Sequence, residues 1–67
     1  MDLQILEHVN SKLEERRLEL VDFLGRGGAT SYDAYKEVCG QIRGLQTAQL
    51  EIADLVRRVK EINDDRV

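Results

Sequence analysis

The chain has 67 residues, a formal net charge of −3, no proline and a hydrophobic content of 42%. That hydrophobic content is too high for a disordered tail. A single cysteine and a single histidine exclude an internal disulfide and most clustered metal sites. A chain this short buries only about 60% of its unfolded surface. We therefore expect one domain, residues 1–67, that is stabilised by self-association or by docking on a partner.

Residues 3–24 predict a first helix. Asp2 can cap its start, and Gly25 suits the left-handed position that commonly follows a helix. Apolar residues recur at spacings of three, four or seven and therefore share one face. They are Leu6, Val9, Leu13, Leu20 and Leu24, with Ile5 and Phe23 beside them.

Residues 25–30 hold three of the five glycines and predict a turn. A second helix is expected over residues 31–62, where Thr30 and Asp33 resemble a capping box. Its apolar positions again have three-four spacing, interrupted by Gln49. They are Tyr35, Val38, Ile42, Leu45, Ile52, Val56 and Val59. The tail, residues 63–67, is expected to fray.

Two helices joined by a short turn predict an all-α fold, an antiparallel two-helix hairpin. If residues are paired outward from the turn, Leu24 lies opposite Tyr32 and Leu3 opposite Ala53. The second helix then extends past the first with four apolar residues that we interpret as a partner interface, Leu55, Val56, Val59 and Ile62. A shorter second helix is the simpler alternative. The interface interpretation favours a homo-oligomer, such as a four-helix bundle, or docking on a larger protein.

Small residues within the second helix allow two interpretations. Gly40, Gly44 and Ala48 are spaced four apart and lie away from Ile42 on the helical wheel. They either form a second contact face, because small residues let another backbone approach closely, or mark a kinked or weak helix.

Three arginines are candidates for an anion contact: Arg16, Arg17 and Arg26. The simpler interpretation is that the stems of Arg16 and Arg17 cover the core while their charged ends reach glutamates or solvent. Arg26 lies between glycines as in RNA-binding Arg-Gly-Gly elements, but a turn also explains these glycines. Cys39 is expected to be a small buried side chain, and His8 is expected near the surface.

Enzyme motifs are not recognisable in the sequence. We expect no catalysis, cofactor, metal or small-molecule substrate, because nothing suggests a nucleophile, a base and an orienting group in one pocket. No apolar run approaches the length of a membrane span, and Met1–Gln4 lacks the start of a signal peptide. An intracellular setting is expected.

One pattern in the second helix resembles a known group of proteins. It reads Tyr32-x-x-Tyr35, then Gly40-x-Ile42-x-Gly44-Leu45-x-x-Ala48, then Ile52-x-x-Leu55. This is similar to small helical proteins of tailed bacteriophages that are encoded among head and virion assembly genes. The resemblance implies a virion component or assembly factor, in the host cytoplasm or the virion, that binds itself or a larger virion protein.

The overall architecture also resembles Rop-type hairpin dimers, which bind RNA. The alternative function is therefore a small regulator that binds nucleic acid or inhibits a host enzyme. The net charge of −3 and the absence of a basic stripe argue against nucleic acid.

Overall fold

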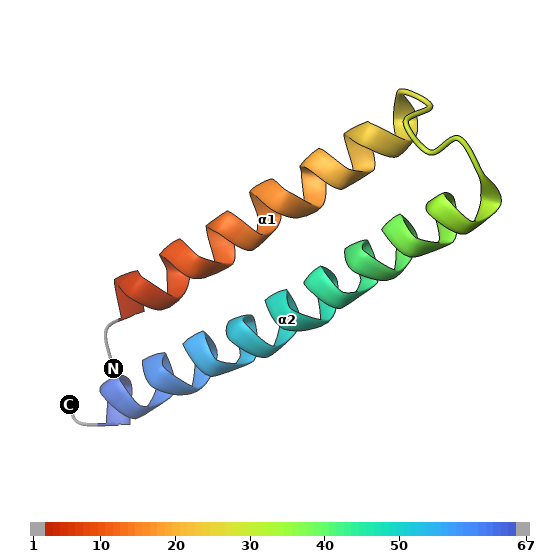
Figure 1. The fold of residues 1–67 in the computed structure, drawn as a ribbon. Coiled ribbons are helices and arrows are strands. Elements are labelled where there is room, and N and C mark those ends of the chain that lie inside the picture. Colours follow the sequence, from red (N-terminus) through yellow and green to blue (C-terminus); the bar gives the residue numbers. More distant parts are fainter. Residues whose placement is uncertain (1–2, 66–67) are drawn as a thin grey trace.

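The computed structural model describes residues 3–65 and shows an antiparallel hairpin of two helices. Helix α1 spans Leu3–Gly25 and helix α2 spans Tyr32–Asp65 (Figure 1). The predicted all-α hairpin is confirmed, and α2 runs three residues further than expected. The molecule is a rod with extents of 55 × 15 × 14 Å. The proposed cap Asp2 and the tail residues 66–67 lie outside the described residues.

The C-terminus of α1 is closed by its glycines. The Gly28 amide donates to the Phe23 carbonyl over 2.9 Å, and the Gly27 amide donates to the Leu24 carbonyl over 3.0 Å. Gly27 has φ 77°, so this is a Schellman motif with Gly27 in the left-handed position. The expectation that Gly25 takes this position was wrong, because α1 continues through Gly25 before the chain reverses.

The start of α2 is capped by a hydroxyl. Ser31 Oγ accepts a hydrogen bond from the Ala34 amide over 3.1 Å. That bond satisfies one of the amides that a helix leaves unpaired in its first turn. The predicted cap, Thr30, lies one residue too early, because α2 begins at Tyr32 rather than at Ser31.

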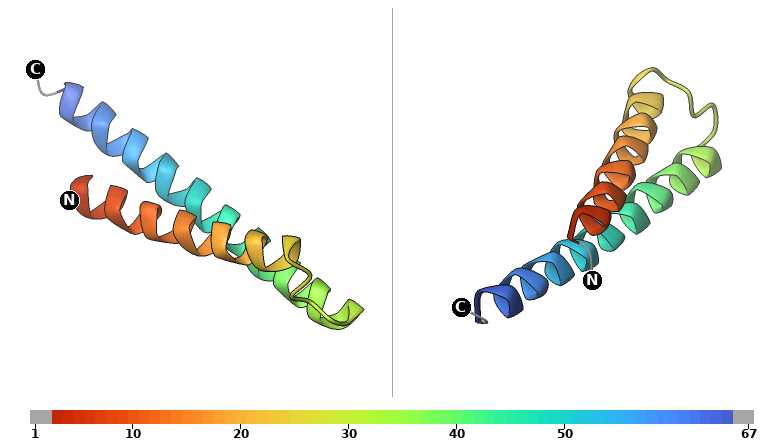
Figure 2. Two further views of the ribbon diagram at one scale, coloured as in Figure 1. Left: turned by 90° about the horizontal axis from the view of Figure 1, so that it is seen from above. Right: turned by 90° about the vertical axis from the view of Figure 1, so that its left-hand side faces the viewer.

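The register of the hairpin differs from the one counted outward from a tight turn. Lys60 Nζ lies 4.0 Å from Glu7 Oε1, so α1 reaches far beyond Ala53 on α2. The connection after Gly27 is not helical, and α2 begins beyond the end of α1 (Figures 1 and 2). Phe23 consequently borders the same hollow as Val38. The prediction that the last part of α2 lacks an intramolecular partner was therefore wrong.

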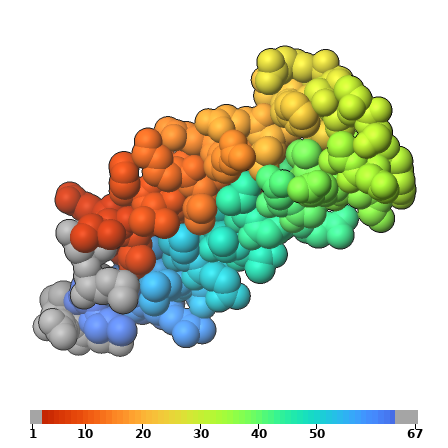
Figure 3. Space-filling model, in the orientation of Figure 1, coloured from red at the N-terminus to blue at the C-terminus, as the bar shows by residue number. Residues whose placement is uncertain are grey.

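The two helices contact each other along a continuous seam (Figure 3). Leu20, 8% exposed, is the most buried of the described residues. The other seam residues are half-buried and follow the three-four spacing of a coiled coil. They are Leu6, Leu13, Arg17 and Leu24 on α1, and Val38, Ile42, Leu45, Ile52, Val56 and Val59 on α2. Val56 and Val59 therefore belong to this seam rather than to a free end.

The hairpin leaves much of its surface in solvent. Its accessible surface is 5260 Å², whereas a compact monomer of this mass exposes about 4300 Å². In the part of the chain that the structure describes, neither helix is long and apolar enough to cross a membrane. The fold thus packs the two helices against each other along one seam but gives the molecule only a thin core.

Candidate interaction surface

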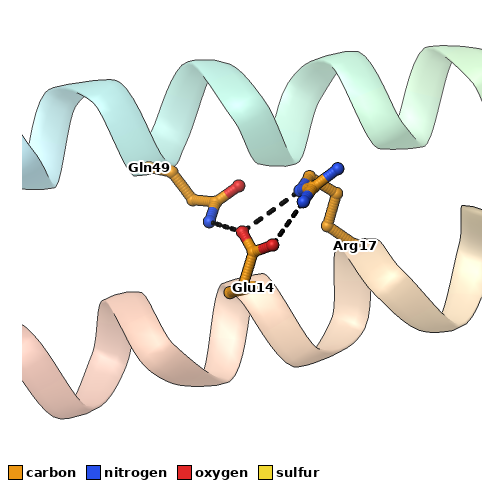
Figure 4. Close-up of polar contacts among 3 residues, drawn as sticks. All are labelled: Glu14, Arg17 and Gln49. Carbon is orange, nitrogen blue, oxygen red and sulfur yellow. Dashed lines mark hydrogen bonds and ion pairs between the residues drawn. The ribbon is translucent and has the colours of Figure 1, made fainter.

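One side of the hairpin carries a polar contact between the helices. The Glu14 carboxylate accepts hydrogen bonds from Arg17 on α1 and from the Gln49 amide on α2 (Figure 4). The hydrogen bond from Arg17, followed by that from Gln49, lowers the pKa of Glu14. Gln49, which interrupts the apolar spacing in the sequence, therefore has a role as a bridge across the seam.

The surroundings of this contact are also polar. Asn10 and Gln49 border two shallow hollows beside the seam. Asn10 Oδ1 is buried and has no hydrogen-bond partner among the described residues. Glu7 and Lys60 lie on the same side as Glu14, since Glu7 and Glu14 border one hollow. We call this side of the hairpin the polar side.

The opposite side carries four large apolar residues, Ile5, Val9, Leu55 and Ile62. Successive residues of a helix are rotated by about 100°. Ile5 and Val9, each two positions from Glu7, lie about 160° around α1 from it. Leu55 and Ile62 lie about 140° and 160° around α2 from Lys60. Because Glu7 and Lys60 face each other, the four residues share the other side, which we call the terminal apolar face.

The terminal apolar face is open to solvent. Ile5 is 61% exposed, Val9 42%, Leu55 36% and Ile62 56%. Sequence reasoning placed Val9 on the buried stripe and Ile5 beside it, and so missed their part in this surface. The signal was present in the heptad spacing Leu3, Leu6, Asn10, Leu13, Arg17, Leu20 and Leu24. That spacing assigns two polar residues to the seam and displaces Ile5 and Val9 from it.

The predicted strip of small residues adjoins this face. Gly44 and Ala48 lie within about 20° of Leu55 around α2, and Gly40 within about 60°. A Cβ added at Gly40 or Gly44 would meet no atom within 4 Å. Gly40, Gly44, Ala48, Leu55 and Ile62 therefore form one stripe along α2, separate from the seam residues Val56 and Val59. Both glycines lie inside a continuous helix.

The three arginines predicted as an anion contact each pair with a carboxylate of α1. Arg16 lies 3.1 Å from Glu19, Arg26 lies 3.0 Å from Asp22, and Arg17 binds Glu14. The Arg17 side chain is only 24% exposed, so its stem covers the seam while its charge is satisfied by glutamate. This arrangement supports the simpler interpretation for Arg17, whereas Arg16 is 58% exposed and shows only the pairing with a glutamate.

The turn end of α2 exposes aromatic residues. Tyr32 is 71% exposed and Tyr35 is 49% exposed. Lys36 Nζ lies 5.7 Å from the centre of the Tyr32 ring. Cys39 is a free, half-buried thiol rather than a fully buried one, and its hydrogen bond with Tyr35 raises the pKa of that phenol. These residues border a hollow lined by α2 alone.

Metal-ligating side chains do not gather in the part of the chain whose side chains the structure describes. No three His, Cys, Asp or Glu side chains there could hold a metal ion together. His8 is exposed on α1, as expected. The terminal apolar face is therefore the strongest candidate site. No family model, curated protein or solved structure matches the chain.

Proposed function

We propose that this chain is a non-enzymatic protein-interaction module that binds a helical surface through its terminal apolar face. One observation carries the proposal: Ile5, Val9, Leu55 and Ile62 come from opposite ends of the chain and share one exposed side. Covering a large aliphatic side chain contributes about 1.5–3 kcal/mol when burial is complete. A hairpin with a thin core gains stability from such cover.

The charges near this face favour a protein partner over a nucleic acid. Binding to a phosphate backbone requires free Lys and Arg side chains, which displace the counterions condensed on the nucleic acid. Arg57 and Arg58 share the single carboxylate of Asp54, at the outer surface of α2, which offsets half of their combined charge. The whole chain carries a net charge of −3, which repels a phosphate backbone.

The setting of this module is the assembly of a bacteriophage-type particle, as a virion component or an assembly factor. The support is the sequence pattern from Tyr32 to Leu55, which resembles proteins of virion assembly regions. Leu55, the last residue of that pattern, belongs to the terminal apolar face. The partner is then another copy of the chain or a larger virion protein.

Site-specific photo-crosslinking in the cells that produce the protein tests this function. A photoreactive residue at Ile62, on the terminal apolar face, is compared with one at Leu50, which is 72% exposed on the same helix. Leu50 lies about 140° around α2 from Leu55 and provides the matched control. We expect protein crosslinks from position 62 and few from position 50.

Two results would contradict the proposal. Equal crosslinking from positions 62 and 50 would show that the terminal apolar face has no preferred partner. Crosslinks from position 62 that disappear after nuclease treatment would favour the nucleic-acid regulator instead. A density gradient tests whether the crosslinked product is found with particles. Its absence from the particle fractions would argue against a virion component.

A further inference from the structure

The surface area of the hairpin matches the area that a dimer of this chain needs to bury. The chain exposes 5260 Å², roughly 950 Å² more than a compact monomer of its mass. A stable protein interface buries about 800 Å² on each partner. One contact of ordinary size over the terminal apolar face would therefore bring each chain close to a compact surface.

The spacing on α2 is self-complementary about Leu55. In an antiparallel α2–α2 contact with a two-fold axis at Leu55, a residue seven positions after it faces the residue seven positions before it. Ile62 and Ala48 stand at those two positions. The exposed isoleucine of each chain thus faces the small alanine of the other, while Leu55 meets its own counterpart.

The charges on α2 are complementary in the same arrangement. Glu51 lies four positions before Leu55 and Arg58 three positions after it, so the two-fold axis brings Glu51 of one chain beside Arg58 of the other. Glu51 makes no ion pair with the described residues. Arg58 can leave Asp54 without leaving that carboxylate unpaired, because Arg57 also contacts it.

Helix α1 supplies the rest of the contact. Val9 lies between Glu7 and Glu14, whose partners on α2 are Lys60 and Gln49. Leu55 falls within that stretch of α2, so Val9 and Leu55 lie at a similar height along the hairpin. The same two-fold axis therefore brings Val9 near its counterpart, and α1 packs over α1 of the second chain.

We infer that a second copy of this chain occupies the terminal apolar face, in an antiparallel four-helix bundle with its two-fold axis at Leu55. This inference rests on the proposed function and names its partner. The contact combines Leu55 with Leu55, Ile62 with Ala48, and Glu51 with Arg58. It extends the seam of the hairpin into the apolar core of a four-helix bundle at the end that carries the chain termini.

Charge reversal, read out by the solution mass from light scattering across a dilution series, tests the inference. The purified wild-type chain is expected at twice its mass of 7.7 kDa and should dissociate on dilution. Glu51→Arg or Arg58→Glu alone should weaken the dimer about tenfold or more, because each puts like charges together. The double variant Glu51→Arg, Arg58→Glu restores opposite charges and should recover the wild-type mass.

Glu61→Arg is the matched control, because this substitution makes the same charge change as Glu51→Arg. Glu61 lies on α2 about 120° around the helix from Leu55. It should leave the dimer intact. Circular dichroism follows helix content in every variant. A single variant that unfolds still tests the inference, since the double variant must then recover both helicity and mass.

A wild-type chain that stays at 7.7 kDa at all concentrations would overturn the inference. So would single variants that dimerise like the wild type, or a double variant that stays monomeric or unfolded. A monomer whose position 62 still crosslinks to another protein in cells would overturn the dimer and leave the proposed function standing. If the chain stays monomeric and position 62 crosslinks to no partner, both the dimer and the proposed function are contradicted.

Discussion

The two ends of the hairpin differ in how tightly the chain holds its two helices. At the turn end, Gly27 and Gly28 close α1, and Leu20 is buried nearby in the seam. At the end that carries the termini, Ile62 is 56% exposed, and the cross-helix ion pair Glu7–Lys60 is long, at 4.0 Å. The turn end is held by local hydrogen bonds and a buried leucine, whereas the terminal end leaves Ile62 open to the contact that we propose.

The largest expected effect lies in the seam toward the turn end. Leu20→Ala removes the most buried side chain of the described residues and should lower the free energy of unfolding by about 2–4 kcal/mol. Leu18, 52% exposed two positions earlier, provides the control, and Leu18→Ala should cost less than about 0.5 kcal/mol. Urea unfolding at one protein concentration compares them. Equal losses would show that the seam is not where the chain derives its stability.

The turn itself gives the next effect. A Cβ at Gly28 would overlap the Phe23 ring, so Gly28→Ala should cost about 1–3 kcal/mol by overpacking. In a Phe23→Ala background the same change should cost less than about 0.5 kcal/mol, because the obstructing ring is gone. Gly25, which has open space within its helix, serves as the control, since Gly25→Ala should be neutral or slightly stabilising. A full Gly28→Ala penalty without the ring would contradict this close approach.

Acidification tests the polar contact between the two ends. The hydrogen bonds from Arg17 and Gln49 lower the pKa of Glu14 in the folded chain. A lowered folded-state pKa adds stability that is present above the unfolded value, about 4.3, and is lost as the pH falls through the folded value. The urea concentration at the midpoint of unfolding should therefore decrease when the pH is lowered below about 4. It should decrease less in Glu14→Gln. Identical acid profiles would show that Glu14 does not stabilise the seam.

The smallest effect is expected at the terminal end. Lys60 and Glu7 are more than half exposed and 4.0 Å apart, so solvent screens their attraction. Lys60→Ala should change the midpoint of thermal unfolding by no more than the error of the measurement, and added salt should not alter that result. A clear loss of stability would mean that this ion pair, rather than a partner, holds the terminal end together.

Local signals predicted the fold well. Periodicity located both helices to within a few residues, because burial of one face imposes that spacing on the sequence. The turn was located too, but the role of Gly27 was assigned to Gly25, two residues earlier, and the role of Ser31 to Thr30, one residue earlier. Nearby glycines and adjacent hydroxyl residues have similar propensities, so only the hydrogen bonds distinguish them.

Register and faces were harder to predict. Counting from a tight turn placed Ala53 opposite Leu3, because the non-helical residues after Gly27 were assumed to add no length. That error assigned Val56 and Val59 to a free end, although they lie in the seam. Leu55 and Ile62, which the sequence suggests as partner candidates, are exposed in the structure, whereas the exposure of Ile5 and Val9 beside them depends on the long-range register.

A disulfide across the two-fold axis tests the central claim most directly. In a Cys39→Ser background, Leu55→Cys places a thiol at the axis, whereas Leu50→Cys places one on the same helix away from the contact. Under mild oxidation at micromolar concentration we expect rapid covalent dimers from Leu55→Cys and slow ones from Leu50→Cys, as followed by non-reducing electrophoresis. Equal rates at the two positions would contradict the account.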